Sequence, residues 1–207
     1  MFLAYASRQG HALLDGALYV PPAWTNDRER CERAGIPEKQ PFATKPQLAR
    51  QMLTHAFDAQ VPAAWVTGDS VYGDDRRLRV WLEEREPAYV LAVSGKEDVW
   101  RGWQQPQVQT GLATLPPDGW TRLSAGVGTK GLRWYEWRWL PLAHPLHPAW
   151  RRWLLVRRSL SDLTALTAYV VFAPHESSLE TVVRVAGSRW TVESCFEAAQ
   201  GEGGLDQ

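Results

Sequence analysis

The segment Val61-Pro-Ala-Ala-Trp-Val-Thr-Gly-Asp69 carries the clearest information about the fold. It is short, apolar on both faces and ends in Gly-Asp, a pattern typical of a central strand that is covered on both sides. A helical pattern capped by Asp74 follows, and then a second buried strand at Tyr89-Val-Leu-Ala-Val93. A strand, a helix and a strand in this order predict an α/β crossover unit.

The chain upstream of this unit predicts a β-hairpin, a loop and a helix. The apolar segments 2–6 and 12–20 lie on either side of Gly10, which supplies the positive φ of a tight turn. Residues 23–43 are polar and predict a loop with one helical turn. Thr44 occupies the N-cap position of a further helical pattern, which has a proline inside its first turn.

The second half of the chain predicts a β-rich region. Residues 94–130 lack periodicity. Aromatic and β-branched strands are predicted after them, at residues 132–140, 153–156 and 167–172. We therefore interpret 94–165 as a β-rich insertion inside one α/β domain that spans residues 1–207. Ser177-Ser-Leu-Glu180 is a capping box and opens another helix.

The composition is that of an ordinary soluble globular protein. Of the 207 residues, 44% are hydrophobic and 22% are charged, which argues against a disordered chain. The formal net charge is zero, so any nucleic-acid-binding surface has to be local. Cys31 and Cys195 lack zinc-site spacing and indicate a reducing, cytoplasmic setting. No apolar run is long enough for a membrane span, so no membrane partner is expected.

Asp69 is the first candidate for chemistry. A carboxylate at the C-terminal end of a parallel strand lies where open α/β sheets bind ligands. There its oxygens suit Mg²⁺, a hard cation that prefers oxygen ligands. The alternative is an aspartate that caps a helix or a turn after the strand, and the segment alone leaves both interpretations open.

A second candidate is the helical stretch from Arg189 to Gln200. Arg189, Glu193 and Gln200 fall within one narrow arc of a helical wheel, beside an apolar arc that would pack on the sheet. A guanidinium, a carboxylate and an amide in a row suit a metal site that acts on phosphodiesters. The alternative is an amphipathic surface helix with an Arg–Glu pair one turn apart.

These residues resemble motifs of bacterial insertion-sequence transposases. Arg189-x-x-x-Glu193 with Gln200 resembles the Y-x-x-R-x-x-x-E-x-x-x-x-x-x-K signature of DDE transposases. Trp65-Val-Thr-Gly-Asp69-Ser-Val-Tyr-Gly73 is similar to the strand that carries their second aspartate. Two further segments are similar to the branch of that superfamily numbered seven hundred and one, namely Ala43-Thr-Lys-Pro46 and residues 190–207.

The resemblance implies an RNase H-like α/β domain, with a mixed sheet, flanking helices and a β-rich insertion before the glutamate-bearing helix. It implies DNA cleavage and strand transfer with two Mg²⁺ ions, for which Mn²⁺ substitutes. Asp69 would be the second metal-binding carboxylate, Glu193 the third, and Arg189 a contact to DNA phosphate. The implied partners are transposon ends and target DNA, and the resemblance also allows a homo-oligomer.

Departures from the family pattern predict an inactive copy. The first family aspartate belongs on an earlier strand, Asp15 is not expected to replace it, and the last helix is expected to continue past Gln207. The chain is therefore predicted to be truncated at both ends. The signature's tyrosine position is Ala186 and its lysine position is Gln200. The alternatives are a non-catalytic DNA-binding remnant that recognises transposon ends, and a decayed product that barely folds.

A basic and aromatic region is the remaining candidate. Arginines and tryptophans interleave in residues 132–139 and 150–158. One interpretation is a DNA-facing surface in which Arg138, Arg151 and Arg152 contact phosphates while aromatic rings stack on unpaired bases. The other interpretation is a packed insertion whose strands turn their charged faces to water.

Overall fold

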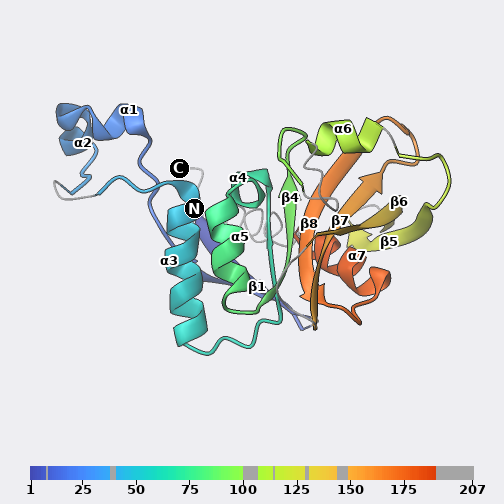
Figure 1. Cartoon of the computed structure of the whole chain (residues 1–207). Helices are drawn as coiled ribbons and strands as arrows, with labels where there is room; N and C mark the ends of the chain where they lie inside the picture. Colours follow the sequence, from blue (N-terminus) through green and yellow to red (C-terminus); the bar gives the residue numbers. More distant parts are fainter. Residues whose placement is uncertain are drawn as a thin grey trace. The chain divides into compact units, whose positions relative to one another are not determined.

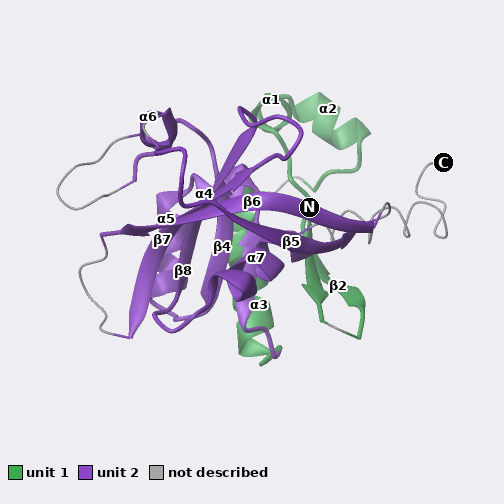
Figure 2. Ribbon diagram, turned by 90° about the vertical axis from the view of Figure 1, so that its right-hand side faces the viewer, with its two compact units in different colours: residues 1–61 green, residues 62–207 purple. Residues whose placement is uncertain are grey.

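The computed structural model describes residues 1–7, 9–37, 41–99, 107–113, 115–128, 131–143 and 149–189. The chain divides into two compact units, Met1–Val61 and Pro62–Gln207, which Figure 2 shows in different colours. No helix in the described part of the chain has the length and apolarity that crossing a bilayer requires.

The first unit begins with a β-hairpin. β1 (Phe2–Ala6) and β2 (His11–Gly16) pair antiparallel, which confirms the predicted hairpin around Gly10. Three helices follow among the described residues of this unit, namely α1 (Pro22–Thr25), α2 (Arg28–Arg33) and α3 (Lys45–Asp58). The segment 23–43 thus holds more helix than the single turn that its polar sequence predicts. Asp27 explains α2, because its side chain accepts the backbone N–H of Arg30 at 3.0 Å and caps the helix.

Side-chain hydrogen bonds fix α3 within this unit. Thr44 begins the helix as predicted, in a capping box in which its backbone N–H donates to Gln47 Oε1 at 2.7 Å. Nδ1 of His55 lies 3.0 Å from Oδ2 of Asp15 on β2. This bond and the backbone N–H of Gly16 hold the pKa of the Asp15 carboxyl below its ordinary value. Asp15 therefore ties the hairpin to α3.

The second unit is built on a six-stranded mixed sheet (Figure 1). Its described elements in chain order are β3 (Trp65–Gly68), α4 (Ser70–Gly73), α5 (Arg76–Glu83), β4 (Ala88–Val93), α6 (Val108–Ala113), β5 (Thr121–Gly128), β6 (Gly131–Leu142), β7 (Trp150–Arg158), β8 (Leu166–Pro174) and α7 (Leu179–Ser188). The strand order is β3-β4-β8-β7-β6-β5, with β3 and β4 parallel and the other neighbours antiparallel. This architecture confirms the predicted α/β class and the crossover from β3 to β4.

The sheet curls around α7. This helix contacts β5 at one edge of the sheet and β3 and β4 at the other edge, so both edges approach the same helix (Figures 1 and 2). Val182 and Val183 of α7 are completely buried against this face. Trp137, Leu155 and Tyr169 are buried in the same cluster and belong to three different strands. Burial of these large apolar side chains is the main stabilising contribution here.

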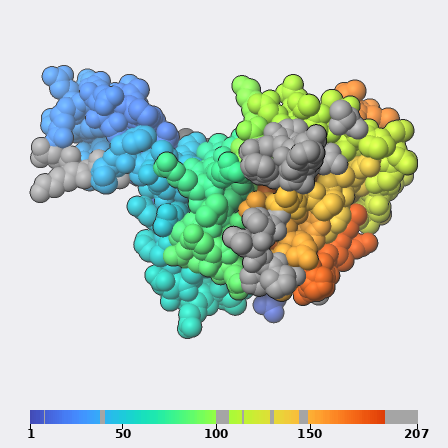
Figure 3. Space-filling view, viewed as in Figure 1, coloured from blue at the N-terminus to red at the C-terminus, as the bar shows by residue number. Residues whose placement is uncertain are grey.

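The opposite face of the sheet is covered by α5, whose outward side lies at the surface in Figure 3. Trp81 and Leu82 of α5 are buried. Tyr89 of β4 donates a hydrogen bond to Oε1 of Glu83 at 2.5 Å, and Arg152 of β7 pairs with the same carboxylate. A shared polar network therefore links α5, β4 and β7.

The position of β3 corrects the sequence prediction. The segment predicts a central strand, but β3 is an edge strand of the described sheet and its four residues are half-buried. Fewer residues pair than expected, because Pro62 has no N–H and the N–H of Val61 still bonds to Ala56 O at the end of α3. Trp65 of this edge strand nevertheless packs against the core around α7.

Two helix starts differ by one residue from the prediction. Asp75, not Asp74, caps α5 and accepts a backbone N–H in its first turn at 2.7 Å. Ser178, not Ser177, caps α7 and accepts the backbone N–H of Thr181 at 3.2 Å. Adjacent Asp or Ser residues are equivalent caps by type, so the register that buries the apolar face of each helix decides between them.

Residues 94–130 contain α6 and β5, neither of which the sequence indicates. The pairing of β5 with β6 shifts between Ser124 and Val127, and this bulge interrupts the alternation that would reveal a strand. The strands β5 to β7 belong to the same sheet as β3 and β4. The boundaries 94–165 of an insertion stay a prediction.

Candidate functional site

Asp69 lies at the C-terminal end of β3 and is exposed. Its Oδ1 accepts the backbone N–H of Val71 at 2.9 Å and caps α4. Its Oδ2 makes no hydrogen bond with any described residue. The cap and the ligand interpretations of Asp69 are therefore compatible, because the cap uses one oxygen and the residue is exposed.

A glycine holds the turn after Asp69 against the sheet. A Cβ on Gly73 would lie 1.7 Å from the carbonyl oxygen of Ala92 on β4, so only glycine allows this approach of the two backbones. Next to it, Oδ1 of Asp74 accepts the backbone N–H of Ser94 at 2.8 Å. These contacts fix α4 to the end of β4, and they fix the position of Asp69 with it.

A buried arginine supports the same turn. Arg79 on α5 is only 7% exposed. Its Nη1 donates to the carbonyl oxygen of Gly73, and its Nη2 pairs with Glu97. A buried guanidinium is tolerated because both its charge and its N–H groups are matched. Arg79 therefore clamps the C-terminal end of α4 from the side of α5.

Tyr72 lies beside Asp69 on α4. A Cβ on Gly68 would come within 3.2 Å of the Tyr72 ring, so the ring packs over the last residue of β3. Partial burial raises the pKa of the Tyr72 hydroxyl, and the negative charge of Asp69 raises it further. The tyrosine therefore stays neutral at physiological pH.

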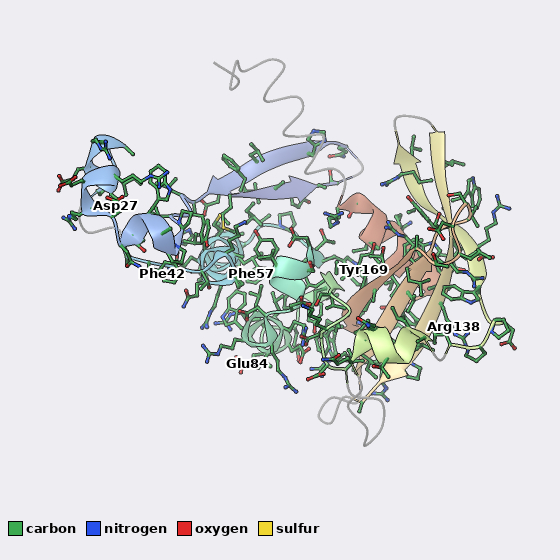
Figure 4. The ribbon with its side chains drawn as sticks, turned by 90° about the horizontal axis from the view of Figure 1, so that it is seen from above. Asp27, Phe42, Phe57, Glu84, Arg138 and Tyr169 are labelled. Carbon is green, nitrogen blue, oxygen red and sulfur yellow. The ribbon has the colours of Figure 1, made fainter. Side chains whose placement is uncertain are left out.

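The C-terminal end of α7 reaches the same end of the sheet as Asp69. Arg189 is the C-cap residue of α7 and acts electrostatically on Tyr169, which Figure 4 labels on β8. Tyr169 pairs with Ala92 near the end of β4, and Gly68 of β3 pairs with the neighbouring Leu91. The predicted residues Glu193 and Gln200 lie outside the described residues.

The three arginines of the basic region do not share one surface. Nη1 of Arg138 donates to the carbonyl oxygens of Pro116 at 2.8 Å and Asp118 at 2.6 Å (Figure 4 shows its place on the molecule). Arg151 is exposed, whereas Arg152 pairs with Glu83. Arg151 and Arg152 are consecutive on β7, so their side chains leave opposite faces of the sheet. Their contact with DNA stays a prediction.

The residues that sequence reasoning missed are those that support the site. Arg79 clamps the turn after Asp69, and Arg133 of β6 donates to the carbonyl oxygen of Gly187 at the end of α7. The glycines Gly73 and Gly187, each inside a helix, are the signals that could have indicated a close backbone approach. Nothing in the local sequence identifies the arginine that reaches each of them.

The curled mixed sheet with flanking helices defines a class of protein, the RNase H-like α/β domains. Residues 1–140 match the family described as DDE superfamily endonuclease. This match covers more than half of the chain, and the chain belongs to this family. Membership implies a transposase-like nuclease function, a DNA substrate and the use of divalent metals. No curated protein matches the chain.

The family match includes Asp69 but ends before α7. The roles of Arg189 and Glu193 therefore rest on the resemblance of their motif. Within the described residues, no three His, Cys, Asp or Glu side chains form a group that could hold a metal ion. Glu193, the second predicted ligand, lies outside the described residues.

Proposed function

We propose that this chain is the nuclease domain of an insertion-sequence transposase, and that Asp69 and Glu193 bind a divalent metal, Mg²⁺ or Mn²⁺. The function would be cleavage and strand transfer of DNA at transposon ends. The observation that supports this proposal is the exposed carboxylate of Asp69 at the end of β3, at the same end of the sheet as Arg189.

The chemistry of Asp69 fits such a metal. A carboxylate whose Oδ1 is fixed by a backbone N–H presents its second oxygen without rearrangement, and hard divalent cations prefer oxygen ligands. A metal ion held there would activate water and stabilise the charge that develops on a phosphodiester. The protein's own contribution is to hold Asp69 rigidly through Gly73 and Arg79.

Arg189 is proposed to contact the phosphate of the DNA. A guanidinium at the C-terminal end of a helix is favoured by the partial negative charge of that end. Its fork of N–H groups suits bidentate contact with phosphate oxygens. Gln200 is proposed as a further DNA contact, as are the arginines on the strands, of which Arg151 is the most accessible.

Metal binding tests the assignment of the two carboxylates. Asp69→Asn and Glu193→Gln are each expected to weaken Mn²⁺ binding by about tenfold or more while thermal unfolding stays close to wild type, because each removes one ligand charge. Isothermal titration calorimetry of the full chain measures the affinity. Glu84→Gln, an exposed change at the end of α5, is the matched control and should bind like wild type. Equal affinity in all four proteins would refute the assignment.

A nicking assay separates the enzyme from the DNA-binding alternative. The full chain is incubated with supercoiled plasmid that carries insertion-sequence ends, with and without Mn²⁺. Nicking that needs Mn²⁺ and is lost in Asp69→Asn supports the nuclease. Binding to the ends without nicking supports instead a non-catalytic remnant that recognises them. That second outcome would agree with Gln200 and Ala186 at the signature's lysine and tyrosine positions.

A further inference from the structure

Arg133 joins two parts of the second unit that lie far apart in sequence. Its Nη2 donates to the carbonyl oxygen of Ala125 on β5 at 2.9 Å and to that of Gly187 on α7 at 3.0 Å. The last carbonyls of a helix have no partner within the helix, and a basic side chain is a favourable one. Arg133 therefore caps the C-terminal end of α7 from the neighbouring strand pair.

The β-bulge in β5 makes this contact geometrically available. The pairing of β5 with β6 shifts between Ser124 and Val127, and Gly126 within the shift has a φ of 96°. Oγ of Ser124 accepts the backbone N–H of Gly126 at 3.2 Å and stabilises the irregular turn. The bulge turns the carbonyl of Ala125 out of the ladder, toward Arg133 and α7.

The close approach of α7 to this bulge requires a glycine. A Cβ on Gly187 would lie 1.8 Å from the carbonyl oxygen of Ala125, so the helix backbone rests directly on β5. The stem of Arg133 lies over Gly128, because a Cβ on Gly128 would lie 2.9 Å from its Cδ. The guanidinium thus bridges two backbones that already lie close together.

We infer that Arg133 is a positioning residue for the proposed metal site, an inference that rests on the proposed function. It fixes the end of α7 two residues before Arg189 and six residues before Glu193. Its guanidinium donates to two backbone carbonyls, so it acts on the site through α7 and not on the substrate. Arg79 has the corresponding positioning role for Asp69, because it donates a hydrogen bond to the carbonyl oxygen of Gly73.

The test compares Arg133→Gln and Arg133→Lys with Arg122→Gln in the full chain. Arg122 is exposed on the same strand pair and stacks over Trp134, so its replacement removes the same charge without touching α7. Two quantities are measured, the Mn²⁺ affinity and the amide hydrogen exchange of the last turn of α7 in the metal-free protein. Thermal unfolding confirms that each variant is folded under the conditions used.

We expect Arg133→Gln to weaken Mn²⁺ binding by about tenfold and to speed exchange in the last turn of α7, but not in α5. Arg133→Lys should show a Mn²⁺ affinity and an exchange rate between those of wild type and Arg133→Gln, because an ammonium cannot bridge two carbonyls with the fixed geometry of a guanidinium. Arg122→Gln should match wild type. If Arg133→Gln does not fold, Arg133→Lys is compared with wild type and with Arg122→Gln instead.

The failure of this inference is distinct from the failure of the proposed function. If the wild-type protein binds Mn²⁺ and both Arg133 variants bind it with the same affinity, the proposed role of Arg133 is wrong. The proposed metal site is not affected by that result. A wild-type protein that does not bind Mn²⁺ refutes the proposed function. In that case the inference falls with it, whether or not exchange at the end of α7 becomes faster.

Discussion

Single glycines decide how closely two helices approach the sheet. Gly73 of α4 and Gly187 of α7 each face a strand carbonyl at a distance that leaves no room for a Cβ. In both cases an arginine from another element donates to the glycine's own carbonyl oxygen. A glycine and an arginine therefore fix the backbone close to each of the two candidate site residues, Asp69 and Arg189.

Replacing Gly73 by alanine is expected to destabilise the protein by about 3 kcal/mol, because the new methyl group would overlap the carbonyl of Ala92 and force α4 away from β4. Urea unfolding measures the loss. Gly111→Ala is the matched control, since Gly111 is also helical and a Cβ there meets nothing within 4 Å. The control is expected to be neutral or more stable by about 0.5 kcal/mol. Equal effects of the two changes would show that the close contact at Gly73 is relieved without cost.

At the scale of elements, the start of α7 distinguishes two adjacent serines. Oγ of Ser178 accepts the backbone N–H of Thr181, whereas the sequence assigns the cap to Ser177. A cap must lie just before the first residue whose side chain turns into the core, and the burial of Val182 and Val183 fixes that register. Residue type alone therefore locates a helix start only to within a residue.

Ser178→Ala is expected to lower the free energy of unfolding by about 1 kcal/mol, because one N–H of the first turn of α7 loses its acceptor. Ser177→Ala should change it by less than about 0.5 kcal/mol. Urea unfolding of the two variants measures the difference. A larger loss in Ser177→Ala than in Ser178→Ala would contradict the observed cap and restore the sequence assignment.

On the scale of the whole molecule, the buried Tyr89 connects stability to pH. Its hydroxyl donates to Glu83, and Arg152 reaches the same carboxylate, so one network spans α5, β4 and β7. Burial raises the pKa of Tyr89 well above its ordinary value, and the charge of Glu83 raises it further. The unfolded chain therefore loses this proton first as the pH rises, and stability falls from about pH 10 upward.

Tyr89→Phe is expected to cost about 1 kcal/mol at neutral pH, because a buried hydrogen bond to Glu83 is lost. The same variant should lose less stability than wild type between about pH 8 and about pH 11, since it has no hydroxyl to ionise there. Urea unfolding across this pH range measures both effects. Tyr135→Phe is the control, and an alkaline loss that is the same in all three proteins would refute this role of Tyr89.

The sequence by itself determined the features that depend on neighbouring residues. The two apolar segments on either side of Gly10 predicted the hairpin, and Thr44 predicted the start of α3. The apolar runs within residues 61–67 and 89–93 predicted the two parallel strands, which the structure places at 65–68 and 88–93. Asp69 follows the first of these strands directly, so its place at the strand end could also be predicted. These inferences succeed because periodicity, capping and turn geometry act over a few residues.

Only the tertiary structure decided the features that join distant residues. The edge position of β3, the curl of the sheet around α7 and the approach of Arg189 to the end that carries Asp69 all depend on strand order. The bridge from Arg133 to Gly187 spans 54 residues. Strand order and such contacts are set by the packing of the whole core, to which every element contributes, and no local pattern of the chain records them.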